Sequence, residues 1–195
     1  MAKDLTNNKE LNKYLDPILT ETYYIQNILN DLNIFARLNN QIFQIQKEEI
    51  LILPFVRQII IQILNQEIWE NVDISFHPNQ SIENTYVKID KFLFSRVIHN
   101  IIYNSILHNP SGCKIDISLS KVDEKIYLSI LDNGIGVKPE QLHQLNSLDE
   151  KNFDIAFIRT TGIGLYISKR IIQLNQGELK ISSKYKQFFK VEIII

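Results

Sequence analysis

The chain has 195 residues, of which 45% are hydrophobic, enough to bury the core of one good-sized domain with or without a small appendage. Its 21 basic residues nearly balance its 22 acidic residues, which argues against a large phosphate-neutralising surface for DNA or RNA. The single cysteine, Cys113, excludes an internal disulfide and a thiolate-rich metal site.

The first predicted element is a long amino-terminal helix. Its apolar residues alternate four and three positions apart, the spacing that forms a seam along one side of a helix. The seam consists of Leu11, Leu15, Ile18, Ile25, Leu29, Leu32 and Ala36, with Thr22 as a break. Asp16 and Pro17 fit either the start of a helix or a kink inside a longer one. An uncovered seam of this kind predicts self-association.

The remainder of the chain interleaves helices and strands. Alternating side chains predict a short strand at residues 42–47, followed by a helix from about Leu53 to Gln66. Next come strands at 72–76 and 86–89, a helix at 91–108, and paired strands at 115–120 and 126–131. A short helix at 139–145, a helix at 163–175 and strands at 178–183 and 188–194 complete the chain. The order lacks a regular βαβ repeat, which favours an α+β fold with a two-layer α/β sandwich over a doubly wound parallel sheet.

Residues 132–136, Asp-Asn-Gly-Ile-Gly, directly follow a predicted strand. A carboxylate at the strand end can accept a hydrogen bond from an exocyclic amine such as adenine N6. The two glycines allow a sharp turn and a close approach of the backbone to a ligand. The same residues also form ordinary turns, so this segment alone leaves both interpretations open.

A second glycine-containing segment, Thr-Thr-Gly-Ile-Gly-Leu at residues 160–165, opens a predicted helix. The free N–H groups and the positive dipole end of a helix start form an anion site, and glycines leave room for a phosphate. A simple loop that leads into a helix is the alternative.

The predicted helix at 91–108 carries Asn100 and Asn104, four residues apart and therefore on one face. A buried helix face rarely carries two amides without a use, and an amide oxygen is a hard ligand that suits Mg²⁺. The alternative is a pair of capping or inter-helix hydrogen bonds.

Taken in chain order, the three segments resemble the N, G1 and G2 boxes of the GHKL ATPase superfamily, and specifically the catalytic domains of histidine kinases. Residues 91–110 resemble the N box, 132–136 the G1 box and 162–170 the G2 box with its helix. Residues 14–38 are similar to the second helix of the dimerisation and phosphotransfer hairpin that precedes these domains. The resemblance implies a Bergerat-type mixed sheet of about five strands covered by helices. It assigns residues 1–40 to the hairpin helix and 41–195 to the ATP-binding domain.

Carried over by motif position, the resemblance implies that Asn104 ligates Mg²⁺, that Asn100 supports the phosphates of ATP or their metal, and that Asp132 reads adenine N6. The other implied nucleotide contacts are His108, Gly134, Gly136, Thr161, Gly162, Ile163, Gly164 and Leu165. Hydrolases of the superfamily carry a glutamate at the position of Asn100, and an amide cannot take a proton from water. We therefore expect slow ATP hydrolysis.

Several positions depart from the family pattern. Leu107 stands where the family usually has a lysine or arginine that reaches the phosphates, and Thr160 replaces the first glycine of the G2 box. The lid between the boxes has Phe153 and Phe157 in place of a fuller F box. Either Arg159 or Lys151 is a candidate for the missing cation, and an ordinary solvated position is the alternative for both.

None of the four histidines lies on a helix before the one that starts near Leu11, where the family has its phosphoacceptor. The sequence thus predicts a kinase module that donates the ATP γ-phosphate to a histidine on another helix and does not autophosphorylate. Its expected partners are that helix, a response regulator and, in the parent protein, a second copy. A degenerate nucleotide- or partner-binding module is the alternative, whereas Asn100 and the long first helix argue against an anti-sigma-type serine kinase.

The amino terminus lacks the apolar stretch of a secretory signal, and no window approaches about 18 uncharged apolar residues. We therefore expect a cytoplasmic chain without a membrane segment, and the resemblance implies a membrane-anchored sensor as its parent.

Overall fold

The computed structural model describes residues 2–38, 44–65, 71–147 and 163–195. The chain divides into two compact units, residues 1–41 and 42–195. Within the described residues, no helix is both long and apolar enough to cross a lipid bilayer.

The first unit consists of one helix, α1 (Ala2–Leu38). The helix runs through Asp16 and Pro17, so this pair lies inside a longer helix and does not begin one. Most of the predicted seam is exposed, namely Leu15, Ile18, Ile25, Leu29 and Leu32. A stripe of exposed apolar side chains is a surface suited to helix packing. The assignment of α1 to a phosphotransfer hairpin stays a prediction.

The second unit is built on a five-stranded mixed sheet with the strand order β2-β4-β5-β7-β6. Its strands are β2 (Val72–Pro78), β4 (Cys113–Val122), β5 (Lys125–Asp132), β6 (Glu178–Lys184) and β7 (Phe188–Ile194). The β2–β4 pair is parallel and the other three pairs are antiparallel. A separate antiparallel pair joins β1 (Glu48–Leu51) to β3 (Tyr86–Ile89). The predicted α+β class and mixed five-stranded sheet are confirmed.

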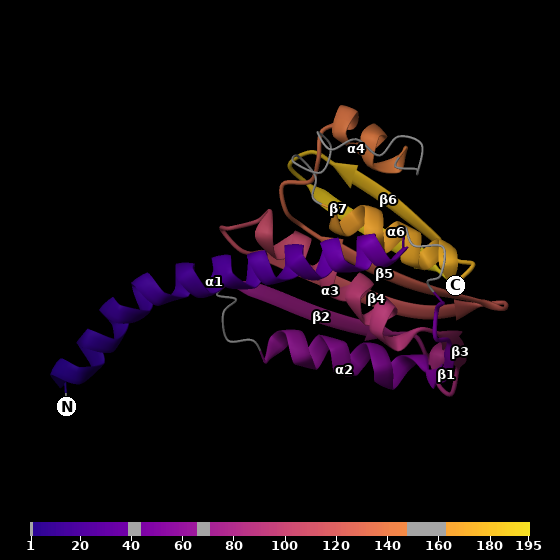
Figure 1. Ribbon diagram of the computed structural model, residues 1–195, viewed down its shortest axis with the longest axis horizontal. Coiled ribbons are helices and arrows are strands. Elements are labelled where there is room, and N and C mark those ends of the chain that lie inside the picture. The colour runs from indigo at the N-terminus through magenta and orange to yellow at the C-terminus, as the bar shows by residue number, and fades with distance from the viewer. Residues whose placement is uncertain (1, 39–43, 66–70, 148–162) are drawn as a thin grey trace. The chain divides into compact units, whose positions relative to one another are not determined.

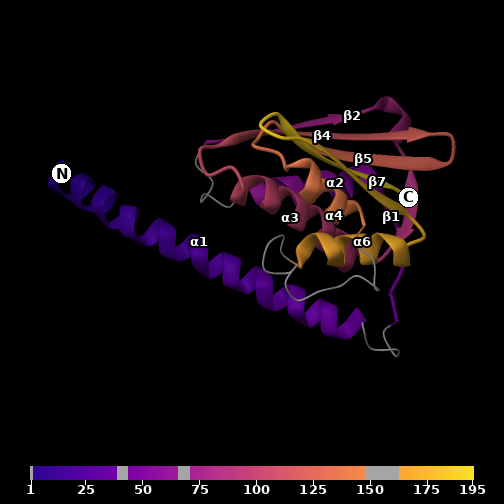
Figure 2. The same cartoon turned by 90° about the horizontal axis from the view of Figure 1, so that it is seen from above.

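Helices cover one face of this sheet (Figures 1 and 2). They are α2 (Ile52–Leu64), α3 (Lys91–Leu107) and α6 (Gly164–Leu174), while α4 (Pro139–Asn146) packs against β6. A short 3₁₀ helix, η1 (Gln80–Ile82), follows β2. Along β4, Ile115, Ile117 and Leu119 are buried and the residues between them are exposed. Because side chains alternate every two residues, the apolar row of β4 faces the helices and the other face of the sheet is polar.

The predicted strand at 42–47 is wrong. The strand of this region is β1, at residues 48–51, and residues 44–47 have no regular structure, while residues 42 and 43 lie outside the described part of the chain. The partner strand β3 explains the shift, because its four residues pair with 48–51 and it is followed at once by Asp90. The Asp90 side chain accepts from Leu93 N at 3.0 Å, which caps α3, and from Gln46 N at 3.1 Å. The N–H of Gln46 thus donates to a side chain and not to the backbone of a partner strand.

Candidate functional site

Asp132 is the last residue of β5 and faces the helices, with only 2% of its surface exposed. One carboxylate oxygen accepts from Ser105 Oγ at 2.8 Å and the other from Gly134 N at 3.0 Å. Burial raises the pKa of the Asp132 carboxyl, and these hydrogen bonds oppose that shift only in part. Because each carboxylate oxygen has two acceptor sites, the group retains acceptor capacity for a ligand.

Asn109, just beyond α3, connects this carboxylate to the loop that follows it. Its Nδ2 donates to Ser105 O at 2.6 Å and lies 3.5 Å from Asp132 Oδ1, while its Oδ1 accepts from Ile135 N at 2.9 Å. A Cβ added at Gly134 would collide with the Asn109 amide. The glycine at position 134 therefore makes room for a protein side chain, and the amide holds the 132–136 loop in place.

The turn between β6 and β7 supports the same loop from the other side. Gly136 has a φ of +55°, and a Cβ there would lie 2.5 Å from Lys184 O and 2.6 Å from Phe188 O. Lys186 N donates to Ile135 O at 2.6 Å. A left-handed residue packed against two carbonyl oxygens requires glycine.

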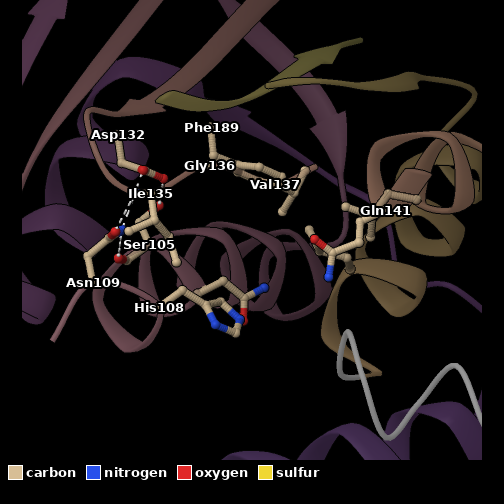
Figure 3. A pocket seen from close by; sticks show the side chains of 12 residues that line it. Ser105, His108, Asn109, Asp132, Ile135, Gly136, Val137, Gln141 and Phe189 are labelled. Carbon is tan, nitrogen blue, oxygen red and sulfur yellow. Dashed lines mark hydrogen bonds between the residues drawn. The ribbon is translucent and has the colours of Figure 1, made fainter. Parts of the chain in front are cut away.

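These contacts border a pocket of about 190 Å³ (Figure 3). Its lining comprises Asn104, Ser105, His108, Asn109, Asp132, Ile135, Gly136, Val137, Gln141, Leu145, Leu165 and Phe189. Asp132, Ser105 and Asn109 gather at one end of the pocket, and Gln141 lies at the other. Pockets that enclose a drug-sized ligand measure about 300–1,000 Å³, so this one encloses only part of a nucleotide. A fixed acceptor between apolar walls suits a flat ring that bears an amine.

Asn104 of α3 and His108, the residue that caps the end of this helix, both line the pocket, since residues four apart share a helix face. Burial lowers the pKa of His108, and the nearby Asp132 carboxylate raises it in part. Burial thus favours the neutral imidazole, which can both donate and accept. The Asn104 side chain offers an amide oxygen at the pocket wall.

Asn100 lies one turn earlier on α3, is 6% exposed and is not among the residues that line the pocket. Its Nδ2 donates to Gly164 O at 3.3 Å, and Ser168 Oγ donates to the same carbonyl at 2.8 Å. Asn100 therefore fixes the start of α6 against α3. The hydrogen bond from Asn100 is thus of the inter-helix kind that was the alternative interpretation of the sequence. The role of Asn100 at the phosphates stays a prediction.

The structure brings five predicted site residues to one pocket: Asn104, His108, Asp132, Gly136 and Leu165. Four others do not line it, namely Asn100, Gly134, Ile163 and Gly164. Thr161 and Gly162 lie outside the described residues, as do Thr160 and the lid positions Lys151, Phe153, Phe157 and Arg159.

Sequence reasoning missed Ser105, Asn109 and Gln141 as pocket residues. Ser105 and Asn109 have partners across the fold, so no local signal identified them. Gln141 gave no local signal for a pocket either, because its contact with Lys138 N is a helix-start contact that says nothing of a ligand.

The pocket suits a metal that arrives with its ligand. Within the described part of the chain, no three or more His, Cys, Asp or Glu side chains cluster as a metal site, and no lysine or arginine lines the pocket. Protein-bound Mg²⁺ commonly uses one or two protein oxygens together with substrate phosphates and water. The Asn104 amide oxygen fits that pattern.

Comparison with known proteins agrees with this geometry. The sequence profile described as histidine kinase-, DNA gyrase B-, and HSP90-like ATPase matches residues 89–195. Sensor histidine kinase YvrG of Bacillus subtilis is 28% identical over 162 residues, which cover 83% of this chain and 28% of that protein. The chain thus spans less than a third of the length of this relative.

Solved structures share the fold. The catalytic domain of histidine kinase ThkA superposes with a TM-score of 0.64 at 20% identity, covering 77% of this chain and 95% of that one. ThkA in complex with response regulator protein TrrA gives a TM-score of 0.68 at 20% identity, covering 94% of this chain and 51% of that one.

Proposed function

Because the chain belongs to the family of histidine kinase-, DNA gyrase B- and HSP90-like ATPases, with sensor histidine kinases as relatives, we propose that it binds Mg-ATP and donates the γ-phosphate to a histidine of a separate helix. The observation that carries this proposal is the convergence of Asn104, Asp132 and the first turn of α6 on one pocket. Asp132 accepts from the adenine amine, and the apolar walls hold the ring. The phosphates extend out of the pocket toward Asn104.

In phosphoryl transfer the protein mainly positions the reactants and takes little part in covalent chemistry. A histidine nitrogen attacks the γ-phosphorus, the bond to the β–γ bridging oxygen breaks, and ADP leaves with the electron pair. Mg²⁺ neutralises the phosphate charge when bound, and Asn104 is the residue that would hold it. Asn100 has no carboxylate to activate water, and its amide holds Gly164 at the start of α6. The missing carboxylate favours transfer to a protein acceptor over hydrolysis.

Isothermal titration of the full chain with ATP and Mg²⁺ tests the nucleotide site. Asp132→Asn preserves an acceptor for Gly134 N and is expected to weaken ATP binding about 10- to 100-fold, because a charge-assisted hydrogen bond to the adenine amine is lost. Asn104→Ala is expected to reduce the dependence of binding on Mg²⁺ and to leave adenosine binding in place. A wild-type chain that gives no heat and no thermal shift with saturating Mg-ATP would refute the proposal.

A second candidate is a degenerate nucleotide-binding module without phosphotransfer. It is favoured by the pocket lining, which has no cation within the described residues, and by Leu107, which is 37% exposed where a phosphate-binding cation would stand in the family. The two candidates differ in one assay, transfer of γ-labelled phosphate to a separately produced acceptor helix. Acid-labile label on that helix supports the kinase, and ATP binding without transfer supports the degenerate module.

The proposed partners are the acceptor helix, a response regulator and a second copy of the chain that covers the exposed seam of α1. Half a helical hairpin leaves such a seam open, so association is expected to increase with concentration. Sedimentation at several concentrations tests the last partner, and a strict monomer at all of them would contradict it.

A further inference from the structure

Gln141 is the one polar side chain that α4 contributes to the pocket lining of the described residues. Its Oε1 accepts from Lys138 N at 3.3 Å, so it caps the start of α4. A backbone N–H requires an acceptor, which fixes the orientation of the amide and leaves Nε2 as the free donor. Within the described part of the chain, Gln141 Nε2 makes no hydrogen bond, since the bond of this side chain to the protein is through Oε1.

Gln141 lies at the end of the pocket that the sugar of a bound nucleotide would occupy. Figure 3 shows Asp132 and Gln141 at opposite ends of the pocket, with Gly136 and Val137 between them. In an adenine nucleotide, the amine and the glycosidic nitrogen lie at opposite ends of the ring system. A base whose amine meets Asp132 therefore directs its sugar toward the end of the pocket where Gln141 lies.

We propose that Gln141 is a specificity-determining residue whose Nε2 donates to a ribose hydroxyl oxygen of the bound nucleotide, so that the site prefers ribonucleotides to deoxyribonucleotides. This inference rests on the proposed function, because it assumes that Asp132 accepts a hydrogen bond from the amine of the base. Gln141 is an exposed residue at the pocket mouth, so water competes with the contact. The preference is therefore expected to be modest, about two- to five-fold in affinity.

The ratio of two affinities tests the proposal. Titrations of the full chain compare ATP with 2′-deoxyATP and with 3′-deoxyATP, each with Mg²⁺ at one ionic strength. The wild type is expected to bind ATP about two- to five-fold more tightly than at least one deoxynucleotide, and the identity of that nucleotide assigns the hydroxyl. Gln141→Leu is expected to bring the ratio to about one.

Two further variants separate recognition from the cap at the start of α4. Gln141→Glu keeps an acceptor for Lys138 N and can accept the hydroxyl proton, so it is expected to retain the preference. Gln144→Leu changes an exposed glutamine of the same helix and is expected to leave the ratio unchanged.

A role confined to the cap would weaken all three nucleotides equally in Gln141→Leu and keep the wild-type ratio, which would overturn the proposal. A wild type that binds ATP and both deoxynucleotides equally would overturn it as well. A wild type that binds none of them would overturn the proposed function itself, and this inference with it.

Discussion

Replacement of Asn109 by alanine is expected to lower the free energy of unfolding of the second unit by about 2–4 kcal/mol. Asn109 is 7% exposed, and its amide makes the 2.6 Å bond to Ser105 O and the 2.9 Å bond from Ile135 N. Losing the donor to a buried carbonyl costs about 1–3 kcal/mol, and losing the part-buried Ile135 bond costs about 0.5–1.5 kcal/mol. The 3.5 Å contact with Asp132 is at the limit of hydrogen bonding and adds little.

Gly134 provides the matching half of a double-mutant cycle. The three atoms nearest to a Cβ at Gly134 all belong to the Asn109 side chain, so Gly134→Ala is expected to cost about 1–3 kcal/mol in the wild type. In the Asn109→Ala background the collision is removed, and the same change is expected to cost less. The two substitutions should therefore be non-additive by about 1–2 kcal/mol.

Urea unfolding followed by far-UV circular dichroism measures these energies. Asn146→Ala is the matched control, since it removes an exposed amide with one 3.2 Å bond to Ile181 O and is expected to cost about 1 kcal/mol or less. Additivity of Asn109→Ala and Gly134→Ala within about 0.5 kcal/mol would refute the reasoning. An Asn109→Ala cost no larger than that of the control would do so too.

The remaining predictions concern Asp132, Gly136 and Cys113. Because burial raises the pKa of Asp132 above its ordinary 3.8, the folded state binds this proton more tightly, so stability falls as pH rises through the folded pKa. Asp132→Asn should flatten that part of the pH profile of urea unfolding, and an unchanged profile would contradict the assignment. Gly136→Ala should cost about 2–4 kcal/mol in the same assay, because its φ of +55° and two nearby carbonyl oxygens exclude a Cβ, and a cost below about 1 kcal/mol would argue against this. Burial raises the pKa of the Cys113 thiol from 9.0 to about 11. At neutral pH the native thiol should therefore react with iodoacetamide at least about 100-fold more slowly than the thiol of the chain unfolded in urea. Equal rates would exclude a buried thiol.

Local signals explain where sequence prediction of the fold succeeded. The helix predicted from residue 91 begins there because Asp90 caps it, and the strand at 86–89 ends one residue before that cap. The strands at 115–120 and 126–131 pair as expected, because their alternation of apolar and polar residues is a property of the chain itself. The strand at 42–47 failed because alternation cannot reveal which residues a partner strand will pair with.

The sequence by itself determined which segments supply the candidate site: an asparagine on a helix, an aspartate at the end of a strand and a glycine in the sharp turn that follows the strand. Those features depend on helix period, strand polarity and backbone freedom, which neighbouring residues control. The tertiary structure decided which side chains share the pocket. Asn109 meets Ile135 across 26 residues of sequence, and Gln141 reaches the pocket only because α4 packs against β6. Such contacts depend on the packing of distant elements, because a side chain's hydrogen-bond partner is set by what the fold brings beside it.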